Sequence, residues 1–239
     1  MSSCTMESVE LRSKTKIIAC AVVVEELRSR LPSGIECETL DFGLHRSPEL
    51  LRGKLQETID RSADYPVIVL AYALCGMAVN GLRSKSSTLV IPKADDCIAV
   101  FLGSRKAYLK QQADFPGTLF LSKGWIEGRI DDTSPKVAIF RSLVARWGEE
   151  KAARMLAVYE NRQPLRHYRR LSFITTSNES NLDEYKRIAR GRAAELGLEY
   201  SEIKGSTAFM DKIAAGVWDE EFVVAEPGRS VAFTDFGVI

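Results

Sequence analysis

The stretch VIVLAYALCG, residues 67–76, contains eight consecutive apolar residues before it reaches Cys75 and Gly76. A short, continuous apolar run that ends in a turn residue is typical of a β-strand buried on both faces. Such strands occur in parallel sheets that helices cover on both sides. The stretch therefore predicts a buried strand that gives way to a loop at Cys75, which is either a small packing residue or a ligand.

The same pattern recurs from Lys16 onward, because short β-prone apolar runs alternate with longer segments that have helical spacing. This alternation predicts an α/β fold with a mainly parallel sheet and helices on both faces. We expect strands at residues 16–22, 37–42, 67–72, 87–92, 117–122, 171–176, 198–203 and 221–226.

Helix signals lie between these strands. Ser47 is placed to cap a helix that has Pro48 in its first turn, and a second helix is expected over residues 182–196. Further helices are expected to start near residues 24, 96 and 148, with Gly103 dividing the second of these.

The polar segment GRIDDTSP, residues 128–135, contains both glycine and proline and is a candidate crossing between two lobes. We expect a disordered tail over residues 1–15, an N-terminal lobe of five strands over 16–128 and a smaller C-terminal lobe of three strands over 129–239. The expected architecture is two Rossmann-like lobes with a crevice at the carboxyl ends of the strands.

Composition limits the classes of function. The chain of 239 residues is 45% hydrophobic and carries 33 basic and 32 acidic residues, so no bulk attraction to nucleic acid or to an anionic membrane is expected. No apolar stretch approaches the roughly 20 residues that span a bilayer, and a cytoplasmic location is expected. The five cysteines are odd in number and irregularly spaced, which favours reduced thiols, some of them metal-bound, over a disulfide framework.

Four potential metal ligands follow four consecutive strands. Cys20 lies near the end of the first expected strand, and His45, Cys75 and Cys97 follow the next three. Because the carboxyl ends of parallel strands meet at one edge of the sheet, these side chains are predicted to converge. A Cys3His set is typical of zinc, with an iron–sulfur cluster as the alternative. The competing interpretation is that each cysteine packs as a small buried hydrophobe.

Two residues beside this set have proposed roles. Asp96, next to Cys97, is a candidate catalytic base or an orienting partner for a ligand, and the alternative is a helix N-cap. Gly76 would allow the chain to turn close to a bound ion or substrate.

Other loops at the predicted crevice supply candidate substrate-binding residues. Gly205, Ser206 and Thr207 precede a helix, so their backbone N–H groups could hold a carboxylate or phosphate or could serve only as a cap. Trp125 follows the fifth expected strand, where it would wall an apolar pocket or cover the core.

The order of several segments resembles the family catalogued as domain of unknown function 1638. The segments are IACAVVVEEL (18–27), LHRSPELL (44–51), YALCG (72–76), VIPKADDCIAVFLGS (90–104), FPGTLFLSKGWIE (115–127) and GSTAFMDKIAAGVWDEEFVVAEPG (205–228). The family usually has glycine where this chain has Ala73. The resemblance implies an association with corrinoid-dependent methyltransferase systems and thus with one-carbon metabolism.

Two classes of function follow. The first is a zinc-dependent methyltransferase that acts on a small-molecule substrate, with a corrinoid protein or a methyltransferase as its partner. The second is a non-catalytic accessory module that holds a corrinoid, an iron–sulfur cluster or a partner enzyme.

Overall fold

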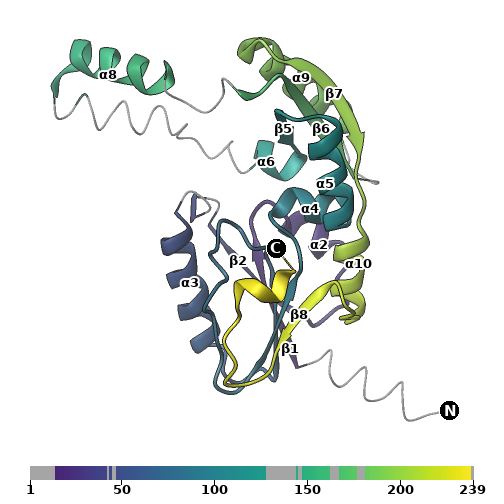
Figure 1. The fold of residues 1–239 in the computed structure, drawn as a ribbon. Coiled ribbons are helices and arrows are strands. Elements are labelled where there is room, and N and C mark those ends of the chain that lie inside the picture. Colours follow the sequence, from purple (N-terminus) through teal and green to yellow (C-terminus); the bar gives the residue numbers. More distant parts are fainter. Residues whose placement is uncertain are drawn as a thin grey trace. The chain divides into compact units, whose positions relative to one another are not determined.

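The computed structural model describes residues 14–41, 43–44, 47–127, 144, 147–161, 167–176 and 181–237. The fold is α/β, as predicted, and it divides into two compact units (Figure 1). The first unit comprises residues 1–111, 176–179 and 204–239, and the second comprises residues 112–175 and 180–203.

The first unit contains a five-stranded sheet in the order β2-β1-β3-β4-β8. Its strands are β1 (Thr15–Cys20), β2 (Glu36–Leu40), β3 (Val67–Ala71), β4 (Thr88–Pro92) and β8 (Phe222–Ala225). The first four are parallel to their neighbours, and β8 pairs antiparallel with β4. This arrangement brings the carboxyl ends of β2, β1, β3 and β4 to one edge of the sheet.

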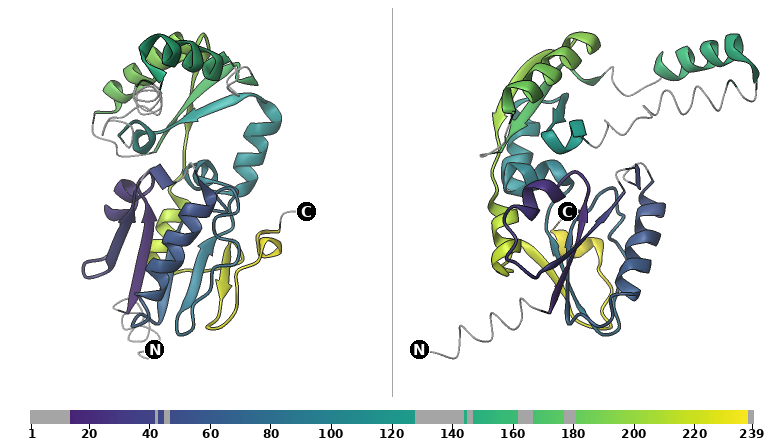
Figure 2. Two further views of the ribbon diagram at one scale, coloured as in Figure 1. Left: turned by 90° about the vertical axis from the view of Figure 1, so that its left-hand side faces the viewer. Right: turned by 180° about the vertical axis from the view of Figure 1, so that it is seen from behind.

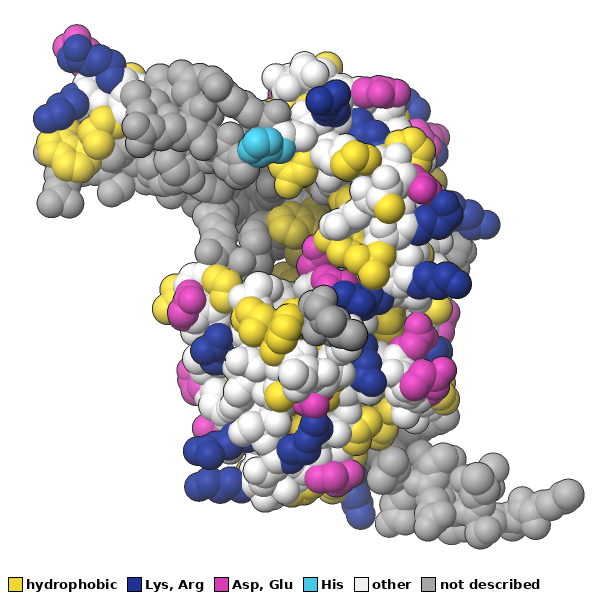
Figure 3. Space-filling view, viewed as in Figure 1, with side chains coloured by type: hydrophobic (Ala, Val, Ile, Leu, Met, Phe, Trp, Pro, Cys, Tyr) yellow, Lys and Arg dark blue, Asp and Glu magenta, His cyan; other side chains and the backbone are white. Residues whose placement is uncertain are grey.

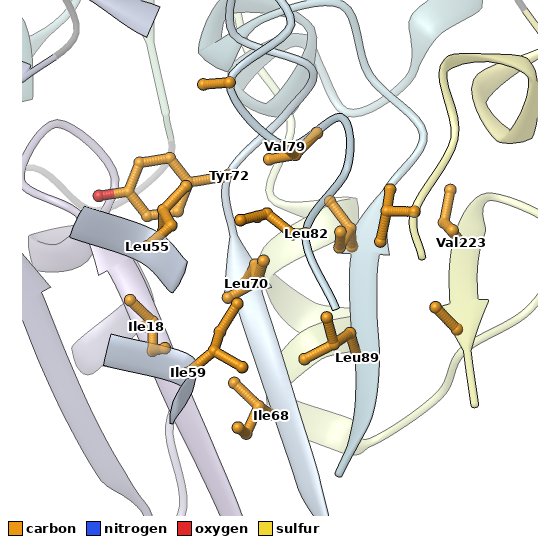
Figure 4. Packing of buried hydrophobic residues seen from close by; sticks show 14 of the residues in the cluster. Ile18, Leu55, Ile59, Ile68, Leu70, Tyr72, Val79, Leu82, Leu89 and Val223 are labelled. Carbon is orange, nitrogen blue, oxygen red and sulfur yellow. The ribbon is translucent and has the colours of Figure 1, made fainter. Parts of the chain in front are cut away.

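Helices cover both faces of this sheet. Figure 2 shows α3 (Pro48–Asp60) on one face and α2 (Val24–Arg28) with α10 (Ala208–Ala215) on the other. All five residues of β3 are buried, as expected for a central parallel strand. In Figure 4, Leu55 and Ile59 of α3 lie against Ile18 of β1 and Leu70 of β3 in one hydrophobic core.

Local signals in the sequence set the helix ends. The Ser47 hydroxyl accepts a hydrogen bond from the Leu50 backbone N–H at 3.4 Å, and Pro48 occupies the first turn of α3. The helical segment after β4 is divided, as predicted, because Gly103 adopts a left-handed φ of 81° between α4 (Cys97–Leu102) and α5 (Arg105–Asp114).

The second unit contains a three-stranded sheet in the order β5-β6-β7. Its elements are β5 (Thr118–Leu121), α6 (Lys123–Glu127), α8 (Glu149–Asn161), β6 (Arg170–Thr175), α9 (Leu182–Leu196) and β7 (Glu199–Lys204). Leu171 and Phe173 of β6 are fully buried and pack with Ala189 and Ala193 of α9. This unit therefore has a hydrophobic core of its own.

The strand pairing differs from the predicted division into an N-terminal lobe before residue 128 and a C-terminal lobe after it. Strand β5 pairs with β6, although its position in the sequence assigned it to the N-terminal lobe. Strand β8, assigned to the C-terminal lobe, instead extends the first sheet beside β4. An apolar run predicts a strand but not its partner, which explains the difference. Of the proposed tail, the structure describes Lys14 and Thr15, and Thr15 is the first residue of β1. Residues 1–13 and the whole proposed crossing segment lie outside the described residues.

Basic and acidic side chains are interspersed over the face shown in Figure 3. Throughout the described ranges, no helix combines the length and the apolar character that crossing a membrane would require.

Candidate functional site: thiols at the edge of the first sheet

Cys20 is the last residue of β1 and is partly buried. Its carbonyl accepts a hydrogen bond from the Val23 N–H at 2.9 Å, so the chain turns at once into α2. Burial raises the pKa of the Cys20 thiol, and the backbone N–H groups of Val22 and Val23 oppose this only in part. The thiol is therefore protonated at neutral pH.

Cys75 stands three residues beyond Tyr72, at the end of a segment that continues the path of β3. The N–H groups of Leu74 and Cys75 donate to the carbonyls of Ala94 at 2.9 Å and Asp95 at 3.1 Å. These two bonds hold the segment beside the chain that leaves β4. Cys75 is thus fixed at the same edge of the sheet as Cys20.

The chain then makes a left-handed turn over three consecutive residues, which we call the Cys75 turn. The φ angles are 45° at Cys75, 64° at Gly76 and 76° at Met77. A left-handed conformation costs about 1–2 kcal/mol for each residue other than glycine. Two such residues, Cys75 and Met77, on either side of Gly76 mark a strained segment, and strain of this kind is concentrated at functional sites.

Cys20 and Cys75 influence each other electrostatically. Burial raises the pKa of Cys75 to about 12, with further contributions from the charges of Cys20 and Asp96. Tyr72, only 4% exposed, lies near both thiols, and its pKa is raised by burial and by their charges. Its hydroxyl donates to the Ala19 carbonyl at 3.3 Å, joining the ends of β1 and β3. The structure therefore brings together two of the four predicted ligands.

Cys97 is the first residue of α4 and is partly buried. Its charge, together with those of Asp96 and Asp95, adds to the burial that raises the pKa of Tyr108. Cys97 thus belongs to a group of side chains around Tyr108 that also includes Asp95 and Asp96. The charge of Asp96 also contributes to the raised pKa of Cys75.

The complete four-ligand set is not visible. His45 lies outside the described residues. Within the part of the chain that the structure describes, no group of three or more His, Cys, Asp or Glu side chains is arranged to hold a metal ion. Cys20 and Cys75 lie at the same edge of the first sheet, and Cys97 is the first residue of helix α4, which follows β4.

Asp96 is the N-cap of α4. Its Oδ1 accepts from the backbone N–H groups of Ile98 at 2.8 Å and Ala99 at 3.3 Å, and its Oδ2 accepts from the Tyr108 hydroxyl at 2.9 Å. Burial raises its pKa despite these bonds. Because both oxygens are engaged, the geometry favours the capping interpretation over a catalytic base.

The side chains of the 205–207 loop are also engaged within the protein. Ser206 Oγ accepts from the Ala208 N–H at 3.2 Å, and Thr207 Oγ1 donates to Asp211 Oδ2 at 2.6 Å. The Ser206 N–H donates to the Phe101 carbonyl at 2.8 Å. The contact with the Ala208 N–H favours the capping interpretation for Ser206. Thr207 is the N-cap residue of α10 but makes no side-chain bond to the helix backbone, and the loop of Gly205 leads directly into this helix.

Trp125 belongs to the second unit, where it packs against the core of that unit. Its backbone N–H donates to Ser122 Oγ at 3.4 Å. The packing matches the interpretation of Trp125 as a residue that covers the core.

The sequence did not identify four residues that shape this region. Tyr72 joins the ends of β1 and β3 through the Ala19 carbonyl, Tyr108 donates to Asp96, and Arg52 donates to the Cys75 turn. Arg105 forms a two-pronged ion pair with Asp95, through Nε to Oδ2 at 2.9 Å and Nη2 to Oδ1 at 3.3 Å. The only sequence signal for these residues was the apolar run that makes Tyr72 buried.

The model of the DUF1638 family, described as a protein of unknown function, matches residues 39–214. The chain belongs to this family. No curated protein and no solved structure matches it at a significant level. The match of this DUF1638 chain includes His45, Cys75 and Cys97, whereas Cys20 lies before its first residue.

Proposed function

We propose that this DUF1638 protein binds a metal ion, most simply zinc, through Cys20, His45, Cys75 and Cys97. One observation supports the proposal: two partly buried cysteines, Cys20 at the end of β1 and Cys75 just beyond its parallel neighbour β3, lie at the carboxyl edge of the same sheet. The topology that delivers them there also delivers Cys97 from the next strand along. Thiolate and imidazole are the ligands that zinc prefers.

The electrostatics of the pair suit a cation. Burial disfavours the thiolate forms of Cys20 and Cys75, and the charges of Cys20 and Asp96 add to this effect at Cys75. A divalent cation between them would offset both effects, and each ligand would lose its proton on binding. The site also requires reduced thiols, which a reducing compartment such as the cytoplasm supplies.

We propose methyl transfer in corrinoid-dependent one-carbon metabolism as the reaction, with a corrinoid protein or methyltransferase as the partner and a small molecule as the substrate. A zinc ion in this position would keep a thiolate available as a nucleophile at neutral pH. The chain's own contribution is the fixed position of Cys75 and the apolar surroundings of Tyr72, which limit access of water.

Metal analysis of protein purified without oxygen tests the metal site. The wild type and a Cys37→Ser control, altered in a cysteine outside the proposed set, should each retain about one equivalent of zinc. Cys20→Ser and Cys75→Ser should each retain less than about half an equivalent. A wild-type protein with no stoichiometric metal would refute the proposal.

The accessory-module alternative is favoured by the capping role of Asp96, because that role removes the proposed general base. An absorption spectrum separates the two functions. A colourless zinc protein that transfers a methyl group from a methylated corrinoid supports the enzyme. Broad charge-transfer absorption near about 400 nm indicates an iron–sulfur cluster, and a red or orange protein indicates a bound corrinoid.

A further inference from the structure

The Cys75 turn is held from one side by helix α3. Arg52 Nη2 donates to the carbonyl of Met77, the last residue of the turn, at 3.1 Å. The ring of Pro48 lies so close that a Cβ added at Gly76 would be 3.1 Å from its Cγ. The first two turns of α3 therefore pack directly on the segment that carries Cys75.

Backbone hydrogen bonds fix the rest of the turn. Cys75 N–H donates to Asp95, as described above, and its carbonyl accepts from the Ala78 N–H at 3.3 Å. The Met77 carbonyl also accepts from the Asn80 N–H at 3.1 Å. Arg52 thus adds a charged side-chain donor to a carbonyl that already has a backbone partner. Such a bond strengthens the hold of α3 on the turn.

When Arg52 donates from Nη2 to the Met77 carbonyl, another of its hydrogen-bond donors is left without a partner in the described part of the chain. Its Nε is buried and has no hydrogen-bond partner among the described residues. An arginine that only solvated the surface would keep this donor in water, because a buried donor without a partner is unfavourable. The contact with the Cys75 turn is the interaction that this placement retains.

We propose that Arg52 is a positioning residue: by tethering the Cys75 turn to α3, it holds the Cys75 thiol where a metal ion can bind it. The inference rests on the proposed metal site. Helix α3 begins three residues after the predicted ligand His45 in the sequence. The tether therefore joins the helix that follows one predicted ligand to the turn that carries another.

The test compares Arg52→Gln with Arg52→Lys and with Arg61→Gln. Arg61 is the C-cap of the same helix and pairs with Glu38 and Glu57, so it is a matched arginine control. Zinc affinity is measured by competition with a chromogenic chelator. Arg52→Gln should bind zinc about 10- to 100-fold more weakly, as is typical when a residue that orients a ligand is lost. Arg52→Lys should recover part of this loss, and Arg61→Gln should match the wild type.

A second measurement uses metal-free protein. Iodoacetamide alkylation of Cys75, followed by peptide mass spectrometry, reports whether the turn opens. Arg52→Gln should accelerate alkylation about fivefold or more relative to Arg61→Gln at equal thermal stability, because a released turn exposes the thiol. Wild-type zinc affinity and alkylation in Arg52→Gln would overturn the inference. If the wild type holds no metal, the metal-site proposal fails, and the alkylation rates alone then decide whether Arg52 positions Cys75.

Discussion

Replacing Asp96 should destabilise the first unit by an amount that its hydrogen bonds specify. In Asp96→Ala, helix α4 loses the cap on the Ile98 and Ala99 N–H groups, worth about 1 kcal/mol. Tyr108, only 8% exposed, loses its bond to the carboxylate, worth about 1–3 kcal/mol. Removing a carboxylate whose charge burial disfavours offsets part of this sum. The expected net loss is about 2–3 kcal/mol.

Asp96→Asn is the matched control, because asparagine caps a helix as well as aspartate does and its amide can still meet the Tyr108 hydroxyl. The free energy of unfolding of Asp96→Asn should fall by less than about 1 kcal/mol. Urea unfolding followed by circular dichroism should show a midpoint about 1 M lower for Asp96→Ala and only a small shift for Asp96→Asn.

The pH dependence of these midpoints has a defined sign. Burial raises the pKa of Asp96 above its ordinary 3.8. The stability that this group contributes is therefore complete below pH 3.8 and is lost as the pH rises through the raised pKa. Over that pH interval the stability of Asp96→Asn should increase relative to that of the wild type, because asparagine does not titrate. An Asp96→Ala midpoint equal to that of the wild type would refute the capping assignment.

Three further predictions concern other parts of the first unit. Gly103→Ala should lower the free energy of unfolding by at least about 2 kcal/mol, because Gly103 has a φ of 81° and an added Cβ would lie 2.3 Å from Ser206 Oγ. The double variant Gly103→Ala/Ser206→Gly should recover part of this loss in urea unfolding, and no recovery would contradict the clash. Lys16→Met should cost about 1–2 kcal/mol, since buried Lys16 pairs with the exposed Glu36 at 2.8 Å and the partly exposed Glu38 at 2.9 Å. Lys16 lowers the pKa of Glu36 below 4.5, so the gap between this variant and the wild type should narrow as the pH falls below 4.5, and a gap that widens would contradict the pairing. Zinc affinity should rise between about pH 6 and pH 8, because Cys75, with its pKa raised to about 12, must release its proton to bind the metal. Calorimetry in buffers of different ionisation enthalpy measures the number of protons released on zinc binding, and a pH-independent affinity would contradict this prediction.

The sequence predicted the existence of each strand better than its neighbours. All eight expected strands are present, each within about two residues of its predicted limits. The pairing of β8 with β4 was not predictable, because it joins Phe222–Ala225 to Thr88–Pro92 across most of the chain. A hydrophobic run records that a segment is buried, whereas its partner depends on the packing of the whole unit.

The site was predictable to the extent that topology alone decides it. Cys20 and Cys75 lie at the same edge because β1 and β3 belong to one parallel sheet, which the alternating pattern predicted, although it did not predict that these two strands are neighbours. The role of Asp96 depended on two N–H groups and a hydroxyl from α5, and only the folded chain shows that all three reach it. The left-handed φ at Cys75 and Met77 had no sequence signal, since both are residues that rarely adopt it.

The contacts that hold Cys75 in a left-handed turn support the proposed ligand role of the thiols over a purely structural one. A protein that needed only small residues at these positions could use alanine at Cys20 and glycine at Cys75, which would avoid the polar thiols and the strain of the left-handed conformation. Instead, Cys75 sits in a left-handed turn that three backbone hydrogen bonds and Arg52 hold in place. Because these hydrogen bonds maintain a strained backbone conformation, they hold the Cys75 thiol in one position. A fixed thiol beside a second thiol offers a soft cation a prepared pair of ligands, whereas a packing residue gains nothing from such precision.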